Sequence, residues 1–248
     1  MGVTCLQQSK YTAAAACFFE SLKAGEAIKN NNLIALAYDN ISTVYAAEKK
    51  FIKALEYSFK ALKIRQQENN TEGMVAVLSS IGSKYVETGD SANAGNYFKK
   101  ALSLYEKTEN KPGIATVYSN ISMLYKKDYK LKIMYELKSQ AIWDEIGPLN
   151  LLSIINTVNI GVTYLDIARN GTGEITPGEN IPAGKTNQLN KAIAYFEKAM
   201  ALSKETNDIN NEAFFTGNLA EAQELAGDYK NAYINFRCYQ RVQDSVYS

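Results

Sequence analysis

The sequence predicts an all-α protein in which antiparallel pairs of helices stack one on the next. The first observation is a six-residue phrase that recurs every 39 or 40 residues. Its copies are Asn40–Tyr45, Ser80–Tyr85, Asn120–Tyr125 and Asn159–Tyr164, with a weaker copy at Asn218–Gln223. The second observation is a small-apolar pair in step with it: Ala61-Leu62, Ala101-Leu102, Ala141-Ile142 and Ala199-Met200. Self-similarity at a fixed period of this length is typical of stacked-repeat architectures.

Each period contains two stretches with the apolar spacing of a helix. In one period the first helix leads to Tyr45, a short turn follows at Lys49-Lys50, and the second helix runs from about Phe51 to Glu68. We therefore expect one domain, 1–248, whose units are about 1–32 (partial), 33–71, 72–111, 112–150, 151–210 and 211–248. Because Tyr11 falls in phase with Phe51, the chain is expected to begin within a first helix and to be a piece of a longer protein.

Small residues are expected where neighbouring helices approach. Ser42, Gly82, Ser122, Gly161 and Ala220 share one position of the first helix. Ala54, Ala94, Ala192 and Ala232 share a position of the second, with Met134 as the exception. Large side chains must interdigitate beside such positions, and the tyrosines that end the phrase are predicted to do so.

Composition excludes several functions. The net charge is +1, from 27 basic and 26 acidic side chains, which gives no basic surface for nucleic acid. There is no histidine, and Cys5, Cys17 and Cys238 have no metal or redox spacing, so no metal and no cofactor is expected. No apolar run predicts direct membrane insertion. The oligomeric state stays unknown.

One stretch, 170–187, interrupts the period with four glycines and two prolines, which are incompatible with a helix through it. It lengthens the turn inside the fifth unit by 19 residues. A loop of this length is either functional or disordered. Gly184-Lys185-Thr186 resembles the end of a phosphate-binding loop, but the glycine spacing is wrong and Pro182 removes a donor.

No catalytic site is expected either. Four candidate carboxylates fall in separate turns without pairing: Glu87, Asp90, Asp166 and Glu174. We therefore predict that the chain is not an enzyme.

The phased small residues, tyrosines and alanines together resemble the tetratricopeptide repeat, in its longer variety of about 40 residues. The resemblance implies a right-handed superhelical solenoid that binds a protein or peptide segment. The ending, Tyr239–Tyr247, is similar to the segment after such repeats in bacterial membrane-anchored histidine kinases (two-component sensors) and transcription regulators. It implies the ligand-sensing part of a signal-transduction protein, periplasmic or otherwise extracytoplasmic. The alternative is a cytoplasmic scaffold or adaptor with no signalling output.

In such arrays the first helices line a concave groove for the peptide. The positions expected there are Asn40, Thr43, Ser80, Ser83, Asn120, Met123, Asn159 and Asn218. Asparagine amides supply both a donor and an acceptor, which suits recognition of a peptide main chain. The alternative is that each asparagine bonds a neighbouring helix or water.

Overall fold

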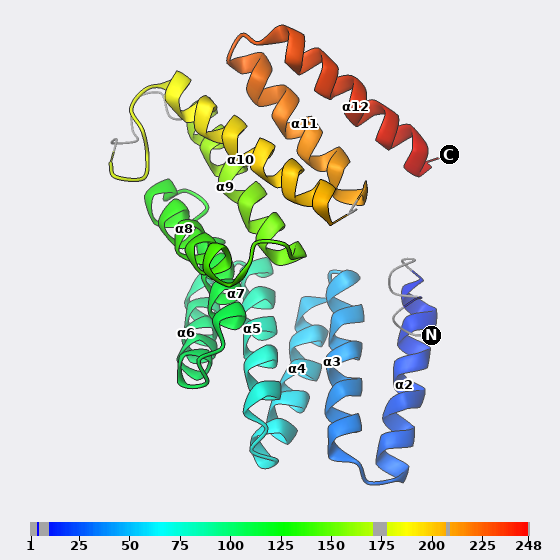
Figure 1. Ribbon diagram of the computed structural model, residues 1–248. Helices are drawn as coiled ribbons and strands as arrows, with labels where there is room; N and C mark the ends of the chain where they lie inside the picture. The colour runs from blue at the N-terminus through cyan, green and yellow to red at the C-terminus, as the bar shows by residue number, and fades with distance from the viewer. Residues whose placement is uncertain (1–3, 5–9, 171–177, 207–208, 248) are drawn as a thin grey trace. The chain divides into compact units, whose positions relative to one another are not determined.

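The computed structural model describes residue 4 and residues 10–170, 178–206 and 209–247 (Figure 1). The regular elements of these residues are helices, with one isolated β-bridge between Gly178 and Ile181. The chain divides into two compact parts, Met1–Gly113 and Ile114–Ser248. The predicted fold class, an all-α array of consecutive helix pairs, is confirmed. The prediction of one domain with six units stays a prediction.

The first part contains five helices, and a sixth begins at its end. They are α2 (Tyr11–Ala27), α3 (Asn31–Ala47), α4 (Phe51–Gln67), α5 (Thr71–Glu87), α6 (Ser91–Lys107) and the start of α7 (Lys111–Ser122). The pairs α2 with α3, α3 with α4, α4 with α5 and α5 with α6 pack side by side. Tyr11 begins α2 as Phe51 begins α4, so the predicted phase of the first unit is confirmed.

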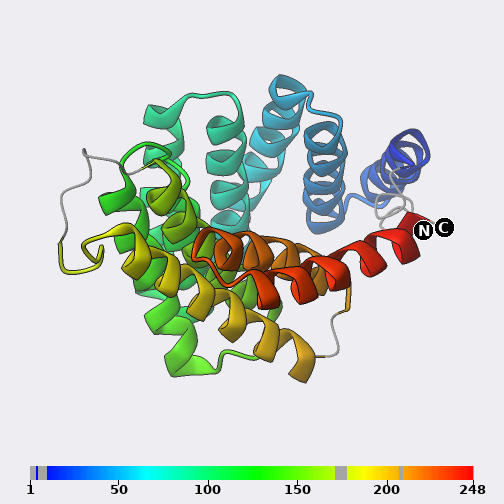
Figure 2. The ribbon, with the colours of Figure 1, turned by 90° about the horizontal axis from the view of Figure 1, so that it is seen from above.

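The second part continues with α8 (Tyr129–Ile146), α9 (Leu151–Asn170), α10 (Lys185–Glu205), α11 (Ile209–Leu225) and α12 (Tyr229–Tyr247). Here α9 packs against α8 and α10, and α11 packs against α10 and α12 (Figures 1 and 2). One buried cluster unites α9, α10 and α11 through residues such as Ile160, Phe196 and Leu219.

Turns between helices follow a 20-residue rhythm. The residue after each helix end adopts a positive φ at Lys29, Lys49, Asn69, Gly89 and Glu109, which is the left-handed conformation that ends helices. A carboxylate or amide then caps the next helix in several turns: Asn30, Asn70, Asp90, Asp128 and Asp228 each accept from a backbone N–H three residues on. The predicted Gly-Asp turn signal is therefore confirmed at both of its sites.

Each predicted tyrosine stacks on a tyrosine of its partner helix. Tyr45 lies on Tyr57 with ring centroids 5.5 Å apart, and Tyr85 lies on Tyr97 at 5.6 Å. Tyr125 with Tyr135, at 5.6 Å, and Tyr164 with Tyr195, at 5.8 Å, repeat the arrangement in the second part. In the last hairpin a hydrogen bond of 2.8 Å from Asn235 Nδ2 to Gln223 Oε1 takes its place. These pairs fix how the two helices of each hairpin align.

The small first-helix position is matched in size by its neighbour on the second helix. Gly82 faces the ring of Phe98, and Gly161 faces that of Phe196. Both phenylalanines are fully buried, because the missing Cβ leaves room for a ring. Where the first helix carries Ser42, the partner is also small, and the Ser42 and Ser58 hydroxyls lie 2.7 Å apart.

One predicted alignment is wrong. Tyr135 follows Tyr125 by ten residues, whereas Tyr57 follows Tyr45 by twelve, so α8 begins two residues earlier than a strict 40-residue period requires. The positions of Ala61-Leu62 are therefore filled by Ser139-Gln140, which are buried, and not by Ala141-Ile142. By the same shift Lys132, and not Met134, is the exception in the row that contains Ala54.

The 19-residue insertion lies where the sequence placed it, and its second half is anchored. Helix α9 ends at Asn170 and α10 begins at Lys185. Between them Ile181 is buried in the core cluster, and Asn180 O accepts a 2.6 Å hydrogen bond from Tyr164 Oη. The segment 178–184 is thus fixed on α9; residues 171–177 lie outside the described residues.

Helix α9 is also long and apolar enough to cross a membrane, by length and composition alone. Two thirds of the relevant window is buried against the rest of the protein. Ile154, Val158, Ile160 and Leu165 belong to the core cluster. Burial of this kind is what a central helix between two others requires.

The predicted small-hydrophobe role for the cysteines is not fully borne out. Cys17 and Cys238 are half-buried thiols without a disulfide, and Cys5 lies outside the described residues.

Candidate functional site

The eight predicted groove positions flank one buried aliphatic residue in each first helix. These aliphatics, at most 6% exposed, are Ile41, Ile81, Ile121, Ile160 and Leu219. The residue just before each one therefore lies at the edge of the core. Thr43, Met123 and Asn159 are exposed, whereas Asn40, Ser80, Ser83, Asn120 and Asn218 are half-buried. All eight border the core without being enclosed by it.

The hydroxyl groups of this set already have partners within their own helices. Thr43 Oγ1 donates to Asp39 O at 3.0 Å, and Ser83 Oγ donates to Ser79 O at 3.2 Å. Ser80 Oγ accepts from Lys84 Nζ at 2.5 Å. These hydroxyls satisfy their helices locally, so they retain little capacity for a ligand.

The asparagines differ. Among the residues that the structure describes, the side-chain amides of Asn40, Asn120 and Asn159 form no hydrogen bond with the protein. An amide offers two donors and an acceptor with two lone pairs, so each of these groups presents its full capacity outward. Asn218 differs again, because it has an interaction partner.

A charged cluster lies beside Asn40 in the first part. Arg65 of α4 forms a salt bridge with Asp39 of α3. Burial raises the pKa of Asp39, and the hydrogen bond from Arg65 opposes that rise. Lys84 of α5 also acts on Asp39, and burial lowers the pKa of Lys84 to about 8. The cluster links three helices at the edge of the predicted groove.

Sequence reasoning missed this cluster. Lys84 occupies the position that Val44 and Ala222 fill in other first helices, and it is only 6% exposed. A lysine three residues after a buried isoleucine was the available signal, since such a position is otherwise apolar. Arg65 finds its space because Gly73 on α5 has no side chain: a Cβ there would overlap the guanidinium.

A second feature that the sequence did not reveal is a buried polar network between α8 and α9. Asn156 Nδ2 donates to Glu136 O at 3.1 Å and to Gln140 Oε1 at 3.0 Å, and its Oδ1 accepts from Ser119 Oγ at 2.6 Å. Thr157 Oγ1 also lies 3.0 Å from Gln140 Oε1. The two-residue shift of α8 places these polar groups where other hairpins have apolar side chains. Because the network is enclosed, it is a packing feature and not a ligand site.

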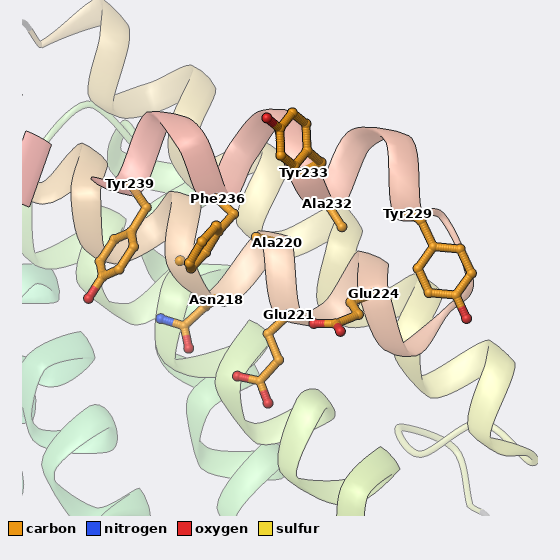
Figure 3. Close-up of a pocket in the computed structure, with 10 residues that line it drawn as sticks. Asn218, Ala220, Glu221, Glu224, Tyr229, Ala232, Tyr233, Phe236 and Tyr239 are labelled. Carbon is orange, nitrogen blue, oxygen red and sulfur yellow. The ribbon is translucent and has the colours of Figure 1, made fainter. Parts of the chain in front are cut away.

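The last hairpin carries an open hollow of about 730 Å³ between α11 and α12 (Figure 3). Its lining is aromatic on α12 and partly acidic on α11. The residues are Gly217, Asn218, Ala220, Glu221, Glu224, Tyr229, Ala232, Tyr233, Phe236 and Tyr239. Phe236 and Tyr239 point toward α11, where Asn218 lies (Figure 3). Of the predicted positions, Asn218 is thus brought into a hollow.

The candidate carboxylates have separate structural roles. Asp90 caps α6, which lowers its pKa through the hydrogen bonds from Asn93. Asp166 accepts from Arg169 Nη1 at 3.3 Å. Glu174 lies outside the described residues. No group of three or more acidic or cysteine side chains among the described residues is placed to hold a metal ion.

Comparisons with known proteins agree with this architecture. The description "Tetratricopeptide repeat" belongs to a family model that matches residues 76–108 and 183–206. The first match covers most of the α5–α6 pair, and the second covers most of α10. The chain has the tetratricopeptide-repeat fold. No curated protein sequence matches it.

Several solved structures share this tetratricopeptide-repeat fold at low sequence identity. BtubC (BKLC) from P. vanneervenii superposes with a TM-score of 0.75 at 15% identity, covering 96% of this chain and 92% of that one. The apo form of RapI gives 0.62 at 14% identity, with 99% and 96% covered. The Rap conjugation gene regulator of the plasmid pLS20, in complex with the Phr* peptide, gives 0.59 at 13%, with 97% and 73% covered.

Proposed function

We propose that this chain binds an extended peptide or protein segment along its first helices. The observation that carries the proposal is the row of amides at Asn40, Asn120 and Asn159, which form no hydrogen bond among the described residues. The periodic spacing repeats one amide per hairpin, as a peptide main chain repeats its donors and acceptors. The structural likeness to the pLS20 regulator bound to the Phr* peptide supports it.

The chemistry fits binding that tolerates sequence variation in the ligand. An amide can accept from a peptide N–H and donate to a peptide C=O, whatever side chain the ligand residue carries. Exposed neighbours, Thr43 and Met123, then contact ligand side chains. Any selectivity comes from these neighbours, whereas the asparagines supply affinity.

A peptide-library capture tests the proposal. Peptides retained by the wild-type chain are measured by isothermal titration against the double variant Asn120→Ala/Asn159→Ala. Each lost hydrogen bond is worth about 0.5–1.5 kcal/mol, so the dissociation constant should rise roughly 5- to 100-fold. Asn96→Ala, an exposed asparagine of α6 outside the row, is the matched control and should leave it unchanged. Equal affinity of the double variant and the wild type would contradict the proposal.

We further propose that this binding serves a signalling protein and takes place outside the cytoplasm. The similarity of Tyr239–Tyr247 to the segment after the repeats of membrane-anchored sensors supports this. Protease treatment of spheroplasts from the source cells is the test. Digestion of the native protein in intact spheroplasts is the expected result. Protection until the cells are lysed would favour the alternative, a cytoplasmic scaffold.

A further inference from the structure

Within the chain, the groove on one hairpin is filled by the first helix of the next. Helix α11 packs on α10 and α9, and it places Phe215, Leu219 and Ala222 in their common core cluster. These three residues are spaced i, i+4, i+7, so they form one apolar stripe of α11. A groove of this kind therefore accepts a helix with that stripe.

The last hairpin presents the same groove without such a helix among the described residues. A shift of 40 residues relates α10 to α12, because Tyr195 of the stacked pair corresponds to Asn235 of the Gln223–Asn235 pair. Phe196 is 0% exposed, whereas Phe236 at the same position is 47% exposed. Leu189 is 2% exposed, and Tyr229 at its position is 71% exposed. The side chains that an adjoining helix covers on α10 are open on α12.

Helix α12 itself carries the stripe that such a groove accepts. Tyr229, Tyr233 and Phe236 are spaced i, i+4, i+7, and Tyr233 is 63% exposed. A single helix thus both lines the groove and has the pattern to fill one. That combination is the requirement for a two-fold contact, in which the same surface of two copies is buried against itself.

Charge agrees with this occupant. The α11 side of the groove carries Glu221 and Glu224, and α12 carries Lys230, Arg237 and Arg241. In a two-fold contact the basic α12 of one copy crosses the acidic α11 of the other. Opposite charges at the rim then favour this pairing.

We propose that a second copy of this chain docks on the α11–α12 groove. The two hairpins pair around a two-fold axis, with Tyr233 and Phe236 of each copy against the groove of the other. The contact lies on the last hairpin and is independent of peptide binding at Asn40, Asn120 and Asn159. It therefore assigns this end of the chain to self-association.

Sedimentation velocity of the 248-residue chain, from about 1 to about 100 µM, tests the proposal. The expected species at the upper end is a dimer of twice the 27.5 kDa chain mass. Tyr233→Glu should raise the dissociation constant at least about 30-fold, as loss of a central aromatic contact does. Glu224→Lys should raise it by a smaller factor that shrinks in 0.5 M salt, because screening weakens charge contacts.

The matched control is Ile52→Glu, which replaces an apolar side chain that is 83% exposed on α4, far from the groove in sequence. It should dimerise like the wild type. Circular dichroism of Tyr233→Glu checks that α12 still folds; should it lose helix, Phe236→Gln takes its place in the titration. A wild-type monomer at every concentration, or a folded Tyr233→Glu that dimerises with unchanged affinity, would overturn the proposal.

Discussion

Glu136 makes the stability of the second part depend on pH. Its carboxyl group is 1% exposed, Thr163 Oγ1 lies 3.1 Å from Oε1, and Oε2 has no hydrogen-bond partner among the described residues. Burial raises the pKa of Glu136 to about 7 from 4.5. Lys132 opposes the rise and Asp166 adds to it, but both effects are smaller than that of burial.

The sign and size of the effect follow from linkage. A raised carboxyl pKa means that the folded state binds a proton that the unfolded chain releases, so stability is full below pH 4.5 and falls as pH rises toward 7. The shift from 4.5 to about 7 corresponds to a loss of about 3 kcal/mol. Glu136→Gln cannot ionise and can still accept from Thr163. Above pH 7 it should therefore be more stable than the wild type by about that amount.

Urea unfolding followed by circular dichroism at pH 5 and pH 8 measures the effect. The stability difference between Glu136→Gln and the wild type should be larger at pH 8 by about 2–3 kcal/mol, and the melting temperature at pH 8 should rise by roughly 5–10 °C. Glu197→Gln, an exposed glutamate of α10, is the control and should show no such change. An equal difference at both pH values would refute the reasoning, because Glu136 would then ionise as freely in the folded as in the unfolded chain.

Three further perturbations test the packing. Gly82→Ala should lower the unfolding free energy by about 1–3 kcal/mol in urea titration, because its Cβ would lie 2.5 Å from the enclosed Phe98 ring, whereas Thr43→Ala at an exposed site should cost under about 0.5 kcal/mol. A double-mutant cycle on Tyr85 and Tyr97 with leucine should give a coupling of about 0.5–1.5 kcal/mol; a coupling near zero would mean that the stacked rings add only buried area. Lys84→Met should gain stability relative to the wild type at pH 7 and lose that gain by pH 10, since burial lowers the pKa of Lys84 to about 8; a difference that is constant with pH would contradict this.

Much of the fold could be predicted because the repeat constrains it redundantly. The row of Tyr45, Tyr85, Tyr125 and Tyr164 identified the residues that align each hairpin, and all four stack as their shared phase implied. Their partners on the second helices were not predicted. A first-helix tyrosine gives no information about which second-helix residue its ring will meet.

The shift of α8 could not be predicted, because Ala141-Ile142 imitates the expected pair. A turn two residues shorter leaves the composition of the helix unchanged and alters only which face is buried. The true pair, Ser139-Gln140, is polar, so the pattern alone argues against its burial. Only the contacts with Asn156 and Thr157 make that burial favourable.

The candidate site was predictable in part for the same reason. The position of Asn40 and its equivalents follows from the buried aliphatic residue beside each one. Whether those amides are already satisfied depends on neighbours that are distant in sequence. The Asp39–Arg65 salt bridge spans 26 residues, and its space depends on a glycine in a third helix.

Modular arrays are commonly pictured as strings of interchangeable bricks, and the Gly82–Phe98 hairpin fits that picture because its matching is internal. The α7–α8 hairpin does not, since Glu136, Ser139 and Gln140 satisfy their polar groups through Asn156, Thr157 and Thr163 of the following helix. Transplanted next to any other hairpin of this chain, those groups would meet hydrocarbon. This module is therefore tied to its successor, and the order of the units at this point is dictated by chemistry.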